Sequence, residues 1–304
     1  MFLFAHNLII GFEGTNTEHA CVKKMLNYAK QNKIKGVIIF RRNIYNYGQL
    51  KRLTQAFKQA KPDIEIASDE EGCWAPFKGV SRLYKLVGPV PSALQMAKNH
   101  TPEEAYKIYR KYAQRLKNLG ITMVFGPVAD LHSDTCPAIG KYERAFSSDP
   151  KKVIAYAKSF IRAFKDEGIK TVVKHYPGHG LSCLDTHAET TNVTQTWQKK
   201  EAIPFRALSK YTPYVMMAHI IDDKVDKDVE TSLSAKHYAN ARAMGYKHLI
   251  TDDLHMGGVQ IRHQPIIEAI RKALAMGAIV IASNMPKSAP NFKFEPDFDL
   301  PDKL

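Results

Sequence analysis

Cysteine is scarce in this chain, and the cysteines present form no recognisable pattern. Four of them are spread over 304 residues, and no two form a C-x-x-C pair. Such spacing excludes a disulfide-rich secreted scaffold and a zinc or redox site of the C-x-x-C type. We therefore expect free thiols and a reducing compartment.

The chain also lacks a long apolar run. No stretch reaches the roughly 18 consecutive apolar residues that a transmembrane helix needs. Residues 1–10 are apolar, but they show neither a basic region nor a small-residue cleavage site, so they predict a buried strand rather than a signal peptide. We expect a soluble, cytoplasmic protein with no membrane partner.

No Gly/Ser linker or low-complexity tract divides the sequence. Although 304 residues could form two domains, α/β barrels of this length fold as one unit. We therefore expect a single domain over residues 1–304, ending in a short irregular, Pro-rich tail at about 286–304.

Acidic residues are fewer than basic ones, 30 against 44, which leaves a formal net charge of +14. Such an excess attracts anions and is one mark of polyanion-binding proteins. Here the basic residues are spread through helical segments, without an arginine-rich tail or an RNA-binding aromatic motif. We expect solvated helix faces and no nucleic-acid partner. A non-catalytic barrel that binds carbohydrate or polyanions is the alternative from another class.

The main positive signal is a repeat of short apolar runs that alternate with helical patterns. Most runs are rich in Val and Ile without polar alternation, as in parallel strands that are buried on both faces. The runs cover 8–12, 36–40, 64–69, 122–128, 171–175, 214–219, 248–253 and 278–284. Helical patterns cover 18–33, 47–60, 101–119, 150–168, 199–210, 234–244 and 264–276. This order predicts an α/β fold, a single (β/α)8 TIM-type barrel. A doubly wound sheet is disfavoured, because the first turn lacks G-x-G-x-x-G.

Polar residues follow several of these predicted strands. Asp69, Asp130, Lys174-His175, His219 and Asp252-Asp253 stand at the ends of five consecutive runs. In a TIM barrel the active site lies at the carboxyl ends of the strands. The pattern therefore predicts a catalytic site built from these side chains.

The stretch K-H-Y-P-G-H-G-L-S-C-L-D-T-H, residues 174–187, has the densest titratable chemistry. Its histidines could bind a metal, but Pro177 and Gly178 break the helix that an H-x-x-x-H site favours, and the spacing matches no zinc pattern. Proton transfer is the better interpretation. Asp185 stands two residues before His187 and can orient its ring, and Asp252 is a candidate partner carboxylate. We expect no metal and no cofactor.

Several motifs together resemble family 3 glycoside hydrolases, in the bacterial exo-β-N-acetylglucosaminidase branch. Residues 174–180 with 185–187 resemble the family's K-H-F-P-G-H-G and D-S-H, and T-D-D-L-H-M-G-G at 251–258 resembles S-D-D-L-x-M-x-G. Shorter matches, to F-x-R-N, V-D-Q-E-G, E-R-S-Y/F and P-A-H, fall at 40–43, 68–72, 143–146 and 217–219. The resemblance is collinear from about residue 8 to residue 285.

The resemblance implies a (β/α)8 barrel that hydrolyses glycosides with retention of configuration. It implies that Asp252 is the nucleophile, preferred over Asp253, and that His187 is the general acid/base, with Asp185 to orient it. It also implies that a second set of residues binds the sugar: Asp69, Arg144, Lys174 and His175. The implied substrate is an amino-sugar oligosaccharide or peptidoglycan-derived muropeptide, from which a monomeric β-N-acetylhexosaminidase releases terminal GlcNAc.

One segment departs from the family pattern. After Gly72, where the family usually continues G-R-V, this chain has Cys73 and Trp74. Lys78 is then the candidate for a second basic sugar contact. The departure leaves open the fine specificity, and a β-glucosidase or another exo-β-glycosidase of the same family is the alternative within the fold.

Overall fold

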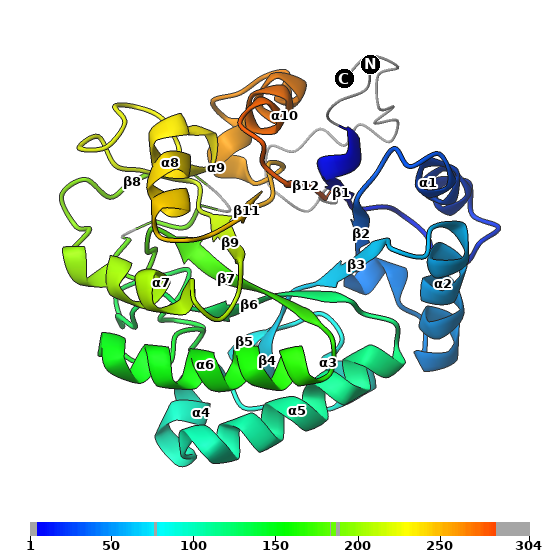
Figure 1. Ribbon diagram of the computed structural model, residues 1–304, viewed down its shortest axis with the longest axis horizontal. Helices are drawn as coiled ribbons and strands as arrows, with labels where there is room; N and C mark the ends of the chain where they lie inside the picture. Colours follow the sequence, from blue (N-terminus) through cyan, green and yellow to red (C-terminus); the bar gives the residue numbers. More distant parts are fainter. Residues whose placement is uncertain (1–4, 76–77, 183, 187–188, 284–304) are drawn as a thin grey trace.

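Eight parallel strands form the centre of the molecule in this computed structural model, which describes residues 5–75, 78–182, 184–186 and 189–283 (Figure 1). The strands are β1 (Leu8–Ile10), β2 (Gly36–Ile38), β3 (Glu65–Ser68), β6 (Met123–Val128), β7 (Lys170–Tyr176), β9 (Tyr214–Met217), β11 (His248–Thr251) and β12 (Val280–Ala282). Each lies within or closely overlaps one of the eight predicted runs. They pair in the order β11-β9-β7-β6-β3-β2-β1-β12, and a parallel bridge between Ile250 and Ile279 joins the two ends. The predicted (β/α)8 barrel is confirmed.

Side chains on both faces of these strands are buried, which explains the absence of polar alternation. Along β1, Ile9 belongs to a core cluster inside the barrel, while Leu8 and Ile10 pack with the helices outside. The inner cluster takes residues from every strand, among them Ile38, Phe125 and Met216. The barrel interior is therefore a packed apolar core that forms the floor beneath the strand ends.

Helices surround the barrel: α1 (Ala20–Lys30), α2 (Tyr47–Ala60), α5 (Pro102–Asn118), α6 (Pro150–Asp166), α7 (Ala202–Leu208), α8 (Ala235–Ala243) and α10 (Ile266–Ala275) (Figure 1). The predicted N-terminal caps of two helices are confirmed. Thr101 and Glu104 form a capping box at α5, and the side chain of Asp149 caps α6. Gly245 and Gly277 follow α8 and α10 with φ of 107° and 76°, a conformation that favours glycine.

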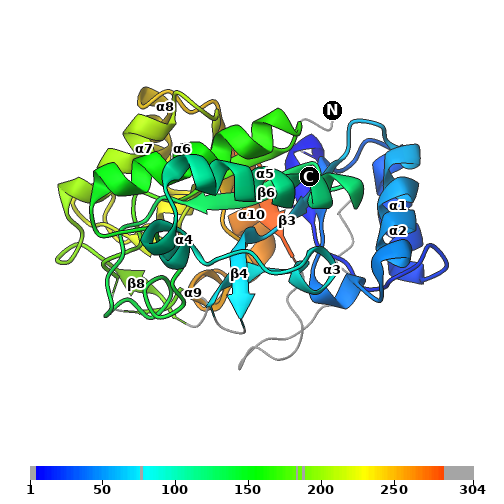
Figure 2. The ribbon, with the colours of Figure 1, turned by 90° about the horizontal axis from the view of Figure 1, so that it is seen from below.

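A hairpin and two short helices are inserted between β3 and α5, and the sequence did not indicate them. They are β4 (Glu70–Ala75), β5 (Lys78–Ser81), α3 (Tyr84–Val87) and α4 (Ala93–Asn99). Short elements also lie in later loops: β8 (Thr191–Asn192), β10 (Ile220–Ile221), α9 (Gly257–Gln260) and the 3-10 helices η1 (Ala5–Asn7), η2 (Arg41–Asn43), η3 (Lys199–Glu201) and η4 (Thr231–Leu233). Figure 2 shows β4, β8 and α9 on the same side of the ring of helices.

Within the described ranges, no helix has the length and apolar character needed to cross a membrane. The predicted tail at 286–304 lies outside the described residues, so the single-domain boundary stays a prediction.

Candidate active site

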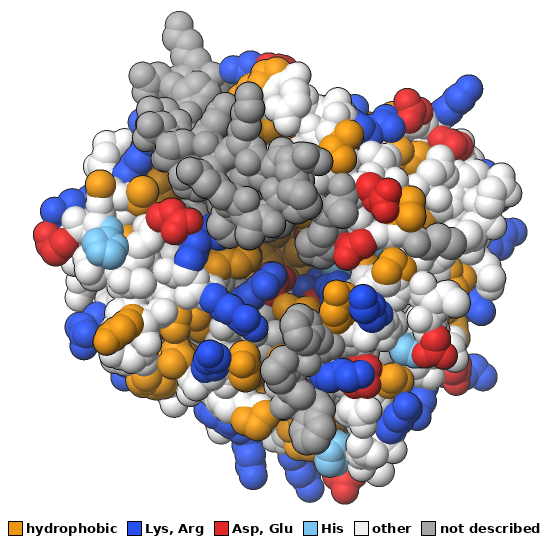
Figure 3. Space-filling view, turned by 180° about the vertical axis from the view of Figure 1, so that it is seen from behind, with side chains coloured by type: hydrophobic (Ala, Val, Ile, Leu, Met, Phe, Trp, Pro, Cys, Tyr) orange, Lys and Arg blue, Asp and Glu red, His pale blue; other side chains and the backbone are white. Residues whose placement is uncertain are grey.

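A cavity of about 270 Å³ lies at the carboxyl ends of the barrel strands. Its apolar lining includes Phe125, Met216 and Ile281 of the barrel interior. Its polar lining consists of Asp69, Glu71, Arg82, Arg144, Lys174, His175, Asp252 and Asp253. Figure 3 looks onto this face of the molecule, where the surface is hollowed near the middle and basic side chains gather beside the hollow. Five of the predicted site residues thus meet in one cavity: Asp69, Arg144, Lys174, His175 and Asp252.

The base of the cavity holds a buried network of ion pairs. Nζ of Lys174 lies 3.2 Å from Oδ1 of Asp69 and 2.6 Å from Oε1 of Glu71. Arg144 donates two parallel hydrogen bonds to Glu71, from Nε at 2.9 Å and from Nη2 at 2.8 Å. Two carboxylates and two cations therefore neutralise one another away from water, which holds all four side chains in defined positions.

The same network sets the protonation of the carboxylates. Burial alone would raise the pKa of Asp69, but Lys174 and Arg82 outweigh it and hold that pKa well below the usual range. Burial likewise opposes the ionisation of Glu71, but Arg144 and Lys174 lower its pKa to about 2. Both groups are therefore ionised at neutral pH and can only accept hydrogen bonds.

His175 joins this network to a second carboxylate. Its Nδ1 lies 2.6 Å from Oδ2 of Asp130, and its Nε2 lies 3.1 Å from Nη2 of Arg144. A guanidinium only donates, so Nε2 is the acceptor and Nδ1 carries the proton that is donated to Asp130. Asp130 also accepts the backbone N–H of His179 at 2.8 Å. The ring of His175 is therefore fixed in both orientation and tautomer.

Asp252 and Asp253 follow β11 directly, and both line the cavity. Their hydrogen bonds differ. Oδ1 of Asp253 accepts the N–H groups of His255 at 3.1 Å and Ser283 at 3.0 Å, and its Oδ2 accepts the hydroxyl of Ser283. Asp252 accepts only the N–H of Asp253, at 2.8 Å, among the bonds formed by the described residues. The carboxylate of Asp253 thus holds backbone N–H groups in place, whereas that of Asp252 lines the cavity and has an oxygen that accepts no hydrogen bond from the described residues.

His219, at the end of β9, supports this pair from behind. It is fully buried, and its Nε2 donates to the carbonyl oxygen of Asp253 at 2.9 Å. Its Nδ1 then accepts from the hydroxyl of Ser232 at 2.8 Å. Burial lowers the pKa of His219, so the ring is neutral and supports the strand end structurally.

The remaining predicted residues lie elsewhere. Asp185 lines an adjoining cavity of about 480 Å³, which shares Arg82 and Arg144 with the first. His187 lies outside the described residues. Lys78, on β5, is not among the lining residues of either cavity; its Nζ pairs with Oε1 of Glu143 at 2.8 Å.

At the departure from the family pattern, Cys73 is buried and lines the adjoining cavity. The side chain of Trp74 lies outside the described part of the chain.

Asp130 was among the strand-end residues but received no role of its own, and sequence reasoning did not select two groups that line the cavity, Glu71 and Arg82. Glu71 stands in the same strand-end motif as Asp69, so the strand-end rule could have included it. Arg82 had no signal, because it follows the unpredicted hairpin β4–β5. Its Nη2 lies 3.1 Å from Oδ2 of Asp69, which places a further basic group in the cavity, whereas Lys78 does not line it.

Glu70, between two site carboxylates in the sequence, points away into a separate buried cluster. It is fully buried and accepts hydrogen bonds from Ser68 at 2.7 Å, from Ser81 at 2.5 Å and from the hydroxyl of Tyr112. The N–H groups of Arg82 and Leu83 also donate to it, each at 3.2 Å. This carboxyl group therefore ties the hairpin to β3 and places Arg82.

Burial raises the pKa of Glu70 to about 7 from its ordinary 4.5, although its hydrogen bonds oppose the shift. Between pH 4.5 and about 7, the carboxyl group of Glu70 is therefore protonated in the folded state but ionised in the unfolded chain. The resulting stabilisation, about 3 kcal/mol, is complete below pH 4.5 and disappears as the pH rises through about 7. We expect this part of the pH dependence of the free energy of unfolding to be missing in Glu70→Gln, as measured by urea denaturation across the range.

The matched control is Glu103→Gln, at an exposed position in the first turn of α5, which should keep the wild-type profile. Parallel stability profiles for wild type and Glu70→Gln would contradict the assignment.

No group of three or more His, Cys, Asp and Glu side chains within the described ranges is arranged to hold a metal ion.

Comparison with known proteins identifies the family of the chain. Residues 14–290 match the model of the glycosyl hydrolase family 3 N-terminal domain. A β-hexosaminidase of Xylella fastidiosa (strain M12) is 28% identical over 273 residues, which cover 83% of this chain and 76% of that protein. A β-hexosaminidase of Photobacterium profundum is 34% identical over 230 residues, which cover 74% of this chain and 64% of that protein.

Solved structures extend the likeness to the fold. NagZ from Neisseria gonorrhoeae, in complex with N-trifluoroacetyl-D-glucosamine, superposes with a TM-score of 0.79 at 26% identity, over 92% of this chain and 82% of that one. A family 3 β-N-acetylglucosaminidase from Paenibacillus sp. str. FPU-7 gives a TM-score of 0.82 at 26% identity, over 91% of this chain and 53% of that one. The resemblance seen in the sequence motifs is confirmed, and the chain belongs to glycosyl hydrolase family 3.

Proposed function

We propose that this protein is a retaining exo-β-N-acetylglucosaminidase that releases terminal GlcNAc from peptidoglycan-derived muropeptides through a covalent glycosyl-enzyme. The observation that carries the proposal is the position of Asp252. Its carboxylate faces a small cavity beside a buried array of ionised hydrogen-bonding groups. The names of the relatives support N-acetylglucosamine as the released sugar, since several are β-hexosaminidases or β-N-acetylglucosaminidases.

In the first step, Asp252 attacks the anomeric carbon as the bond to the leaving oxygen breaks, and His187 gives its proton to that oxygen. In the second step, His187 takes a proton from water, which attacks the anomeric carbon and releases Asp252. Two inversions give overall retention. Asp185 orients His187 and stabilises its charged form.

The ion-pair network at the base of the cavity binds the sugar. Asp69 and Glu71 can accept hydroxyl protons, while Arg144 and Lys174 can donate to hydroxyl oxygens. Arg82 adds a further donor. Phe125, Met216 and Ile281 close the floor of the cavity, whose volume is about 270 Å³. This small volume supports an exo mode of action, in which a single terminal sugar is bound.

The test is a comparison of two chromogenic substrates. We expect 4-nitrophenyl N-acetyl-β-glucosaminide to give a kcat/KM at least about tenfold above that of 4-nitrophenyl β-glucoside, since one set of contacts to the acetamido group accounts for that factor. Release of GlcNAc from GlcNAc-anhydroMurNAc-peptide would then test the natural substrate class.

Faster turnover of the glucoside would favour the β-glucosidase alternative. No turnover of either compound, together with binding to nucleic acid that weakens steeply with salt, would favour the non-catalytic barrel.

A further inference from the structure

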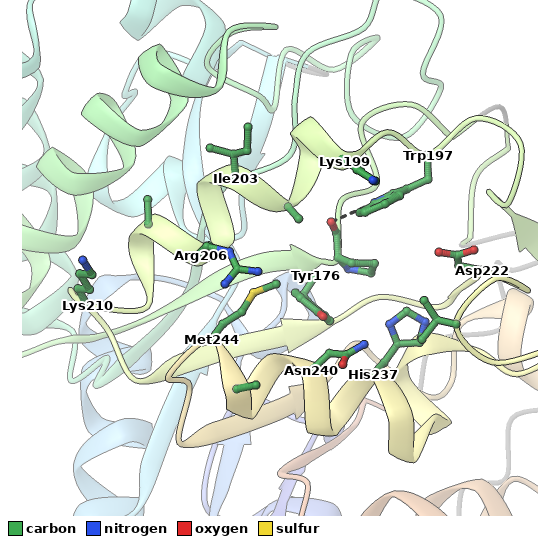
Figure 4. A pocket seen from close by; sticks show the side chains of 15 residues that line it. Tyr176, Trp197, Lys199, Ile203, Arg206, Lys210, Asp222, His237, Asn240 and Met244 are labelled. Atoms are coloured by element: carbon green, nitrogen blue, oxygen red, sulfur yellow. Dashed lines mark hydrogen bonds between the residues drawn. The ribbon is translucent and has the colours of Figure 1, made fainter.

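A further cavity, larger than both of these, lies on the side of the barrel, between α7 and α8 (Figure 4). We call it the helix groove. Its volume is about 710 Å³, within the range of small-molecule sites. Its lining residues are Tyr176, Pro177, Trp197, Lys199, Ala202, Ile203, Arg206, Ala207, Lys210, Asp222, Val225, His237, Asn240, Ala243 and Met244. It shares none of these residues with the cavity that contains Asp252.

The most informative of these residues is His237, on α8. Its side chain is 2% exposed, and both ring nitrogens lack a hydrogen-bond partner among the described residues. Figure 4 shows the ring directed into the groove. Leaving a buried polar atom unpaired costs about 1–3 kcal/mol, so such atoms are rare in folded proteins and call for a physical reason. A bound ligand whose polar group pairs with the imidazole would explain why both ring nitrogens lack a partner among the described residues.

The protonation state of His237 indicates which kind of chemical group can pair with its ring. Burial lowers its pKa to about 4, against the opposing effect of Asp222 and Asp226. The ring is therefore neutral at pH 7, with one donor and one acceptor. An amide group, which also has one N–H and one carbonyl, can pair with either nitrogen. The side-chain amide of Asn240 lies one helical turn along and faces the same space.

The charge of the groove predicts an anionic end on the ligand. Lys199, Arg206 and Lys210 lie along one wall, and their side chains form no ion pair or hydrogen bond with described residues. Figure 4 shows the guanidinium of Arg206 pointing inward, above Tyr176 and Met244. A free guanidinium at the mouth of a largely apolar groove suits a carboxylate, which it can bind through two parallel hydrogen bonds.

The rest of the lining is mainly apolar and can receive a hydrophobic side chain. Tyr176 and Pro177 form the base, Ile203 stands at the rim with 48% exposure, and the indole of Trp197 is fixed by a 3.2 Å hydrogen bond from Nε1 to the carbonyl of Pro177. A surface this apolar next to unpaired cations fits an amphipathic ligand better than a simple anion.

We propose that the helix groove binds N-acylated amino acids, with the carboxylate at Arg206, the amide at His237 and Asn240, and the side chain against Tyr176, Trp197 and Met244. This site is separate from the glycosidase site and does not depend on the function proposed for it.

The test uses N-acetyl-L-phenylalanine and its neutral C-terminal amide. In a Trp74→Phe background, Trp197 is the one remaining indole, because the chain has two tryptophans. We expect N-acetyl-L-phenylalanine to change its fluorescence saturably with a Kd of about 1 mM or tighter. The amide analogue, and the acid with Arg206→Gln, should each bind about tenfold more weakly, since each lacks one charge-assisted contact. Calorimetry on the chain with both tryptophans should give the same constants.

Arg52→Gln is the matched control, because Arg52 is an exposed arginine on α2, and it should leave the affinity unchanged. Three results of the binding measurements would overturn the proposal. They are equal affinity for acid and amide, an unchanged affinity in Arg206→Gln, and no saturable signal up to about 10 mM. Concentration-dependent dimerisation that Arg206→Gln abolishes would also overturn it, because a second copy of the chain would then occupy the groove.

Discussion

Replacing Asp252 with asparagine should lower kcat for 4-nitrophenyl N-acetyl-β-glucosaminide by about four orders of magnitude, the scale of effect seen when an enzyme loses its nucleophile. An amide of the same shape keeps the fold but cannot form the glycosyl ester. Because the sugar contacts belong to other residues, KM should change far less than kcat. Steady-state kinetics on the purified variant would measure both.

Trapping the covalent intermediate gives an independent check on the same residue. A 5-fluoro N-acetylglucosaminyl fluoride forms the glycosyl-enzyme quickly and releases it slowly, so peptide mapping can locate the labelled side chain. We expect the label on Asp252, since the oxygens of Asp253 already bind His255 and Ser283. A label on Asp253, or unchanged turnover in Asp252→Asn, would refute the assignment.

The second large effect concerns Glu71. Replacing it with glutamine should lower the free energy of unfolding by about 3–5 kcal/mol, because Arg144 and Lys174 would lose their shared counterion while remaining buried. The side chain of Glu71 is 2% exposed, and those of Arg144 and Lys174 are 8% and 3% exposed. Water therefore cannot replace the lost charge. Equilibrium urea denaturation followed by circular dichroism would measure the change.

Glu268→Gln is the matched control for this prediction. Glu268 pairs with Arg271 at 2.8 Å, but the two side chains are 63% and 48% exposed. Breaking such a surface pair should cost less than about 1 kcal/mol. If Glu71→Gln were no more destabilised than Glu268→Gln, the ion-pair network at the base of the cavity would not stabilise the fold.

Much of the fold could be predicted because its signals are local. A strand buried on both faces must be continuously apolar, so the run at 36–40 predicted β2 and the run at 122–128 predicted β6. Helix boundaries followed from capping chemistry at Thr101 and Asp149. Asp69, Lys174, His175 and Asp252 were then placed at one end of the barrel by topology alone, because parallel strands bring their carboxyl ends together. The structure places all four in one cavity.

The hairpin β4–β5 was not predicted, because its residues show no clear period of two and their placement depends on distant contacts. Glu70 on β4 binds Ser81 on β5 and Tyr112 on α5, a helix that begins far along the chain. Arg82 reaches the cavity only because this hairpin folds back. Lys78 was a reasonable candidate by composition, but the same hairpin directs it to Glu143.

The sequence by itself determined the barrel, the family and the end of the barrel at which the candidate site lies, since each depends on residue type and order along the chain. Only the tertiary structure distinguished the environments of Asp252 and Asp253, joined Glu71 to Arg144 and Lys174, and formed the groove between α7 and α8. These features arise from the free energies of burial and pairing of side chains far apart in sequence. The ionisation and orientation of a buried group depend on which neighbours the complete fold brings to it.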